Sequence, residues 1–150
     1  MPQLRIDMHS YRWVGYGTVA FFSVCCVGAA ASAQYWPSVV FAIFAFVGLY
    51  IGLGAGSFTA NSEGIAYESR LGKWRILWTE ITSAEHSTLG TLVLRGGNKR
   101  FVLTPPTWWP RSVRPEAIRF VSEQLTGRRI TPQLSKTADY QRMKNTRVVS

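Results

Sequence analysis

The sequence lacks formal charge over one long stretch, since residues 14–62 contain no Asp, Glu, Lys or Arg. Acidic residues are scarce throughout, with 8 Asp and Glu against 17 Lys and Arg, and only two histidines are present. Charged residues normally cover the surface of a soluble domain, so the stretch argues against a soluble globular chain. The two cysteines are the adjacent Cys25 and Cys26, which excludes a disulfide framework. We therefore expect neither a metal nor a cofactor.

The uncharged stretch is long enough to cross a membrane twice, because a helix rises about 1.5 Å per residue and the hydrocarbon layer is about 30 Å thick. Polarity rises briefly in its middle, at residues 32–37. This pattern predicts a transmembrane helical hairpin over 13–57, with spans from about Trp13 to Ala33 and from about Pro37 to Ser57. Aromatic residues typical of membrane interfaces lie near the predicted ends: Trp13, Tyr16, Tyr35 and Trp36.

The cations around this stretch indicate its orientation. Arg5 and Arg12 precede it, the loop between the two spans has no cation, and further cations follow from Arg70 onward. By the positive-inside rule, both termini are cytoplasmic, including the N-terminal residues 1–12. A cleavable secretory signal is the alternative, because Ala31-Ser32-Ala33 resembles a small-residue cleavage site.

Three glycines recur every four residues on the second predicted span: Gly48, Gly52 and Gly56. This spacing puts them on one helical face, where a neighbouring backbone can approach closely. Two partners fit that face. One is the first span, which repeats small side chains at Cys25, Ala29 and Ala33. The other is a helix of another molecule, either a different membrane protein or a second copy in a homo-oligomer.

After residue 57 the pattern changes to short alternating segments between turn formers, which is typical of antiparallel strands. Over 58–127 we predict a small antiparallel β-barrel or sheet capped by one C-terminal helix, so the whole chain is an α+β membrane protein. Residues 128–150 are predicted to be a basic tail that orders only on a partner. Six strands are expected, at 57–60, 65–69, 73–77, 84–87, 91–94 and 100–103. The helix, from about Pro115 to Gly127, is expected to bury Ala117, Ile118, Phe120, Val121 and Leu125.

A series of short strands and one amphipathic helix behind a two-span hairpin resembles the bacterial membrane-anchored pleckstrin-homology-like (PH-like) proteins. The residues that carry the resemblance are Gly64-Ile65-Ala66-Tyr67, before a hairpin, and Trp78-Thr79-Glu80-Ile81, at a bend. The resemblance implies a protein of the bacterial inner membrane with a cytoplasmic PH-like module. It also leaves one strand unaccounted for, and this seventh strand is expected either to be missing or to lie near Trp108.

No pattern of catalytic residues stands out in the sequence. His9 and His86 belong to no nucleophile or metal motif, and the glutamates are scattered over turns and strands. We expect a protein that is not an enzyme. The leading hypothesis is an accessory or assembly subunit that binds another integral membrane protein or complex.

Positive charge is concentrated at the C-terminal end, where residues 111–150 contain nine cations and three carboxylates. The positive-inside rule alone explains such a bias. The alternative is that the domain senses anionic phospholipid, which lies closer than nucleic acid and attracts each nearby cation by about 1 kcal/mol. Candidate anion-binding residues are Arg70, Lys73 and Arg75. Candidates for contact with the membrane interface or a partner are Trp108, Trp109, Arg111 and Arg114, unless the tryptophans form a hydrophobic plug under the sheet.

Overall fold

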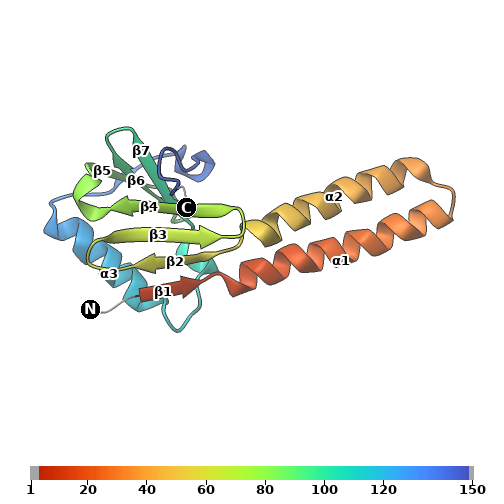
Figure 1. Ribbon diagram of the computed structural model, residues 1–150, viewed down its shortest axis with the longest axis horizontal. Coiled ribbons are helices and arrows are strands. Elements are labelled where there is room, and N and C mark those ends of the chain that lie inside the picture. The colour runs from red at the N-terminus through yellow and green to blue at the C-terminus, as the bar shows by residue number, and fades with distance from the viewer. Residues whose placement is uncertain (1–3, 149–150) are drawn as a thin grey trace. The chain divides into compact units, whose positions relative to one another are not determined.

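The computed structural model describes residues 4–148, and these residues form two compact units. The helical unit comprises residues 8–56 and the turn 69–71, and the sheet unit comprises the rest. Figure 1 shows the elements in chain order. The chain thus begins in the sheet unit, forms the helical unit, and returns to the sheet unit at residue 57.

The helical unit is a hairpin of α1 (His9–Ala31) and α2 (Tyr35–Gly54). Both helices are long and apolar enough to cross a membrane, as the sequence predicts, although each ends a few residues earlier than expected. Their buried residues are all glycines, namely Gly15, Gly48 and Gly52. Large apolar side chains are instead exposed, including Phe21, Val24, Ile43 and Phe46.

The first sheet of the sheet unit has four strands in the order β1-β2-β3-β4. They are β1 (Leu4–Asp7), β2 (Ser57–Ala60), β3 (Gly64–Ser69) and β4 (Gly72–Leu77). Ile65 on β3 and Ile76 on β4 are fully buried. The aromatic rings of Tyr67 and Trp74 lie 5.7 Å apart on the same face.

Strand β1 is the seventh strand, and the sequence analysis placed it wrongly. It precedes the helices and runs antiparallel to β2, with Asp7 opposite Ser57 and Ile6 opposite Phe58. Near Trp108 the structure has a 3-10 turn instead. Alternation cannot reveal a strand with a single fully buried residue, Ile6, whose pairing partner lies beyond the hairpin.

The second sheet has the order β7-β6-β5-β8. Its antiparallel part consists of β5 (Ser83–His86), β6 (Leu92–Gly96) and β7 (Lys99–Leu103), which correspond to three predicted strands. The short strand β8 (Gln133–Leu134) is parallel to β5, so this sheet is mixed. Across residues 4–148 the two sheets form no closed barrel, in contrast to one of the two predicted forms.

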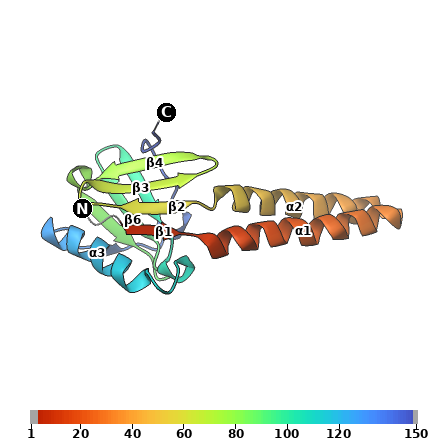
Figure 2. The same cartoon turned by 60° about the horizontal axis from the view of Figure 1, so that its bottom comes forward.

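Helix α3 (Arg114–Gly127) runs along one side of the sheet unit (Figure 2). Ala117, Val121 and Leu125 are buried as predicted. The buried stripe is narrower than expected, however, because Ile118 is exposed and Phe120 only partly buried. Phe120 instead contacts the edge of the fully buried Trp78, with ring centroids 6.3 Å apart.

Residues 128–148 of the basic tail are ordered against the sheets, which corrects the prediction for this part of the tail, and residues 149–150 lie outside the described residues. Strand β8 pairs with β5, and the 3-10 turn Ala138–Tyr140 fully buries Ala138. Residues 142–148, here called the terminal segment, form isolated bridges to both sheets. Tertiary pairing therefore orders a segment whose composition is typical of disorder.

Candidate functional site

The predicted glycine face is occupied by α1 of the same chain. A Cβ added to Gly48 would lie 2.8 Å from Thr18, and one added to Gly52 would lie 2.9 Å from the ring of Tyr16. Gly15 on α1 lies directly against α2, because its added Cβ would overlap the Gly52 backbone. The small residues Cys25, Ala29 and Ala33 are not the contacts of these glycines. Gly56 lies beyond the end of α2, where its carbonyl accepts a hydrogen bond from the Met8 amide (3.1 Å).

The cations Lys73 and Arg75 on β4 are each held by a carboxylate. Lys73 Nζ lies 2.7 Å from Glu68 Oε1, and Arg75 Nη2 lies 2.7 Å from Glu63 Oε2. These pairs are exposed, so each contributes little stability and salt screens it. Arg70 lies in the turn that belongs to the helical unit. Lys73 and Arg75 lie two residues apart on β4 and so on one face of that strand, where an anion would compete with their carboxylates.

Four residues were predicted to contact the membrane interface or a partner, and they are here called the tryptophan loop: Trp108, Trp109, Arg111 and Arg114. Two of them, Trp109 and Arg114, form hydrogen bonds within the domain. Trp109 is only 5% exposed, and its indole N–H donates to the Thr104 hydroxyl at 3.2 Å. Arg114 Nη2 donates to the backbone carbonyls of Thr107 (3.1 Å) and Trp109 (2.9 Å). Arg114 therefore stabilises the loop conformation, a role that the sequence analysis missed, and Trp109 fills the core.

The other two members of the loop, Trp108 and Arg111, are exposed, and Trp108 has 40% of its surface accessible. This difference agrees with the expectation that two adjacent tryptophans cannot easily share one core. Contact with a membrane or a partner at this loop is therefore left to Trp108 and Arg111.

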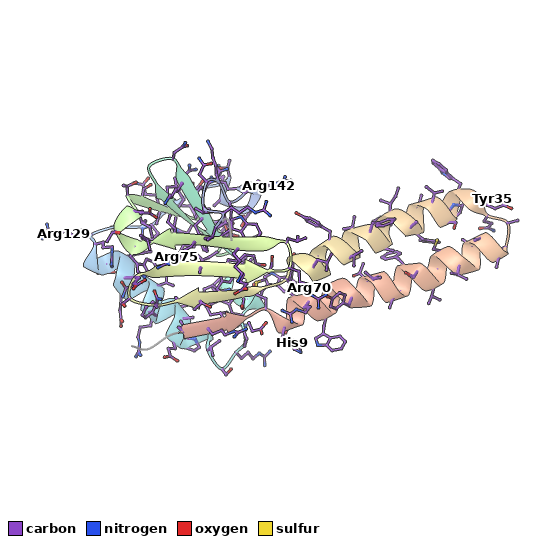
Figure 3. All side chains as sticks on the ribbon, in the orientation of Figure 1. His9, Tyr35, Arg70, Arg75, Arg129 and Arg142 are labelled. Carbon is purple, nitrogen blue, oxygen red and sulfur yellow. The ribbon has the colours of Figure 1, made fainter. Side chains whose placement is uncertain are left out.

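The cations of the tail are not gathered into one patch. Figure 3 shows Arg129 and Arg142 at opposite ends of the sheet unit. Some tail cations are also engaged within the domain, since Arg128 lies over the ring of Trp78, 5.9 Å from its centroid. The tail therefore does not form a single basic face that could bind lipid.

A cavity of about 390 Å³ lies between α3 and strands β5 and β6. None of the described residues that line it is an acid, a lysine or an arginine. His86 lies in its wall, and Nδ1 of this imidazole is buried without a hydrogen-bond partner among residues 4–148. No pattern in the sequence around His86 indicates this environment. A cavity of this size and polarity can accept an apolar group.

Backbone pairing holds the terminal segment against two strands. The amides of Arg100 and Lys144 each donate to the other's carbonyl, at 2.9 and 2.8 Å. The Arg75 amide donates to the Thr146 carbonyl, and the Val148 amide donates to the Lys73 carbonyl, both at 2.8 Å. The segment thus bonds to β7 and to β4.

Two carboxylates hold the preceding part of the tail to the second sheet. Burial opposes ionisation of Glu85, but Arg95 (2.7 Å) and Gln141 donate hydrogen bonds to it, and the net result is a lowered pKa. Asp139 accepts a hydrogen bond from the Thr91 hydroxyl at 2.5 Å, which lowers the pKa of its carboxyl. Ionisation of each carboxyl therefore strengthens its attachment.

Beside the terminal segment lies a polar cavity of about 660 Å³. One wall is formed by residues 145–148 and another by Leu77, Thr79 and the ion pair of Glu80 with Lys99. The hydrogen bond from Lys99, together with one from the Leu77 amide, lowers the pKa of Glu80. The cavity thus adjoins both the segment and the strands that it covers.

Within residues 4–148, no group of three or more His, Cys, Asp and Glu side chains could hold a metal ion. His9 accepts a hydrogen bond from the Trp13 indole N–H at 2.9 Å, in agreement with a structural role. Comparison of the chain with family models, curated proteins and solved structures finds no match. The surfaces of the two units are therefore the basis for assigning a function.

Proposed function

We propose that the chain is a non-catalytic integral protein of the bacterial inner membrane, with both termini cytoplasmic, that acts as an accessory or assembly subunit. The observation that carries the proposal is the pairing of β1 with β2. One strand precedes the helical hairpin and the other follows it, so the two strands that flank the hairpin belong to one sheet. A chain whose helices enter a membrane from this sheet has to cross an even number of times.

The pattern of exposure supports insertion of both helices in a membrane. The large side chains of α1 and α2 are mostly exposed and apolar, whereas a core helix of a soluble protein would bury them. The pairing of β1 also argues against a cleavable signal. Cleavage after Ala33 would remove Ile6, which is fully buried, and leave β2 as an open edge.

The connections between the units are short. Met8 alone separates β1 from α1, and Ala55 and Gly56 separate α2 from β2. Because one residue extends a chain by at most about 3.6 Å, a sheet unit with such tethers stays near the bilayer surface. This restriction suits a module that binds membrane proteins or lipid headgroups.

The order of elements supports a PH-like module. With β1 included, seven strands precede α3, so the strand that the sequence analysis found missing is supplied from before the hairpin. The two tetrapeptides that carry the resemblance begin β3 and form the bend after β4. In PH-like modules the function is binding, which agrees with the surfaces described above.

A partner membrane protein would have to contact a face other than the glycine face, since α1 already covers Gly48 and Gly52. A shallow apolar cavity of about 350 Å³ lies elsewhere on the hairpin. Small residues from both helices line it and would allow close approach of another helix: Ser23, Cys26, Ala42 and Ala45.

Labelling of single cysteines tests the topology. In a chain with Cys25→Ser and Cys26→Ser, we expect an impermeant maleimide to label Gln34→Cys from the periplasmic side of spheroplasts. We expect Arg5→Cys and Arg111→Cys to be labelled only in inverted vesicles. Labelling of Arg5→Cys and Arg111→Cys from opposite sides would contradict the proposed topology.

Co-purification tests the accessory role. A tagged chain at native expression, extracted in mild detergent, should retain a second membrane protein. Ala45→Leu, which fills the cavity, should release this protein, whereas Val24→Leu, outside the cavity, should not. Recovery of the wild-type chain alone as a monomer would count against an accessory subunit.

Contact with anionic lipid is the second candidate, favoured by the exposure of Trp108 beside Arg111. In nanodiscs made with brominated lipid, quenching of tryptophan fluorescence should be stronger with anionic than with neutral headgroups. The difference should disappear in Trp108→Phe and weaken in high salt. Equal quenching on both lipids would dismiss lipid sensing.

A further inference from the structure

Strands β4 and β7 are the outermost strands at one edge of each sheet. An outermost strand presents unpaired amides and carbonyls, which bind any extended chain that reaches them. In this protein the terminal segment, residues 142–148, covers both edges at once. The two edges therefore already accept an added strand, and the present occupant belongs to the same chain.

The hold of the terminal segment on these edges depends largely on its backbone. Four backbone hydrogen bonds join it to β4 and β7, and among its side chains only that of Thr146 is buried. Two of its side chains add bonds to backbone carbonyls, from Asn145 to Asn98 (3.1 Å) and from Thr146 to Arg100 (3.5 Å), and Arg100 Nε donates to the Arg142 carbonyl (2.6 Å). Asn145 has a φ of 52°, so the segment departs from strand geometry between its two bridges. Backbone bonds of this kind do not depend on sequence, and another extended segment could form them.

We propose that the edges of β4 and β7 are a docking site for an acidic, extended segment of a partner protein, which adds as a strand in place of residues 142–148. This inference rests on the proposed function, because it names the class of partner segment that an accessory subunit would bind. The terminal segment then acts as an internal competitor that occupies the site until the partner arrives.

Charge favours an acidic occupant. The two strands contain four cations, Lys73, Arg75, Lys99 and Arg100, and no acidic residue. Carboxylates outside these strands pair with three of the cations, so an acidic strand would compete with Glu68, Glu63 and Glu80. The terminal segment brings three further cations and no carboxylate to the same edges. An acidic strand would replace this like-charge arrangement with a complementary one, which raises both specificity and the rate of association.

The polar cavity supplies room for side chains of the incoming strand. It has a volume of about 660 Å³, lies between the terminal segment and the pair Glu80 and Lys99, and would widen when the segment leaves. In strand addition, backbone bonds give affinity and such side-chain pockets give specificity.

The rest of the tail has separate attachments. Residues 133–134 pair with β5, and Asp139 and Gln141 bond to side chains on the second sheet. The terminal segment can therefore leave while the preceding residues remain bound. Since it stays tethered nearby, its high effective concentration keeps affinity for any external strand low until its own bonds are weakened.

A peptide displacement experiment on the full chain in nanodiscs tests the proposal. The probe is a capped heptapeptide of alternating Glu and Val, and the controls are the same peptide with Lys for Glu and one with N-methylated backbone amides. In the wild-type chain, excess Glu peptide should speed amide exchange at Lys144 and Val148 while Arg75 and Arg100 stay protected. Neither control peptide should have this effect.

A full-chain variant sharpens the result. Lys144→Pro with Val148→Pro removes the two amides that the terminal segment donates to β7 and β4. This variant should bind the Glu peptide at least about ten-fold more tightly than the wild type, because the internal competitor is weakened.

Several outcomes would overturn the proposal. They are equal affinity of variant and wild type, protection by the peptide at other amides, and equal binding of the Lys peptide. Because the wild-type exchange measurement needs no substitution, the proposal stays testable even if the double variant misfolds. Failure of peptide binding with intact topology and co-purification would reject this docking site alone.

Discussion

Helices α1 and α2 bury glycines and expose large apolar side chains, whereas α3 buries apolar side chains and exposes mainly polar ones. In the hairpin the buried residues are glycines and the outward surface is made of large apolar side chains. In α3 the buried residues are Ala117, Val121 and Leu125, and the outward surface is largely polar and charged. All three helices follow the same geometric rules, so the difference lies in the solvent that each surface suits.

In water, burial of apolar side chains is the main favourable contribution to folding, and α3 gains it against the sheets. In lipid this contribution between helices is absent, and close backbone packing through small residues replaces it. The contrast between these helices therefore predicts opposite responses to truncation and to enlargement of side chains.

Truncation should give the largest contrast. Leu125→Ala removes a side chain that is 3% exposed and should lower the free energy of unfolding of the sheet unit by about 2–5 kcal/mol. Ile43→Ala removes as many carbons from a side chain that is 57% exposed, and the loss should stay below about 0.5 kcal/mol. Amide exchange at Leu94 in β6 and at Gly48 in α2 measures the two effects in nanodiscs. Equal losses of unfolding free energy in the two variants would indicate that α2 is packed as a core helix.

Enlargement of a buried glycine at the contact between α1 and α2 should give the next largest effect. A Cβ on Gly15 would lie 2.6 Å from the Gly52 Cα, so Gly15→Ala forces the helices apart and should cost about 1–3 kcal/mol. Gly17→Ala is the matched control, because nothing lies within 4 Å of its added Cβ. That substitution should be neutral or stabilising by up to about 1 kcal/mol through helix propensity. Thermal unfolding in detergent measures both, and identical midpoints would contradict close packing at Gly15.

Local patterns made part of this structure predictable from sequence. Uncharged runs locate α1 and α2, alternation locates six strands, and helical spacing with Pro115 and Gly127 locates α3. Each signal is contained within the element that it identifies. The packing of Gly48 and Gly52 was likewise predicted, with the first span as one of two alternatives, although the contact of Gly52 with Gly15 was not.

Long-range pairing made the rest unpredictable. Strand β1 is recognisable only through its pairing with β2, which follows some fifty residues later. Only one residue of β1 is buried, so its sequence has no alternating pattern to identify it. The tail is ordered by bonds to β4, β5 and β7, so its polar composition was misleading. Lys73 and Arg75 were identified as cations, but their engagement with Glu68 and Glu63 depends on how β3 and β4 pair.

The smallest effect that we predict is a pH response confined to the sheet unit. Burial raises the pKa of Glu85, but hydrogen bonds from Arg95 on β6 and from Gln141 in the tail bring it below the ordinary 4.5. Hydrogen bonds from Thr91 and Ser87, which attach the tail, lower the pKa of Asp139 from the ordinary 3.8. A pKa lowered by folding gives stability that is complete above the ordinary value and is lost as pH falls through the lowered value. Attachment of residues 133–141 should therefore be constant near neutral pH and weaken below about pH 4.

Amide exchange at Ser135 measures this attachment, since its amide bonds to the carbonyl of His86 on β5. Exchange, corrected for its intrinsic pH dependence, should accelerate below the ordinary carboxyl pKa, while exchange within α2 stays unchanged. Asp139→Asn keeps a side-chain acceptor for Thr91 but removes the charge, so it should weaken attachment at neutral pH and reduce the acid response. An unaltered acid response in Asp139→Asn combined with Glu85→Gln would show that these carboxylates do not hold the tail. A parallel acceleration in α2 would remove the contrast between the two units, because no ionisable group of this kind lies within that helix.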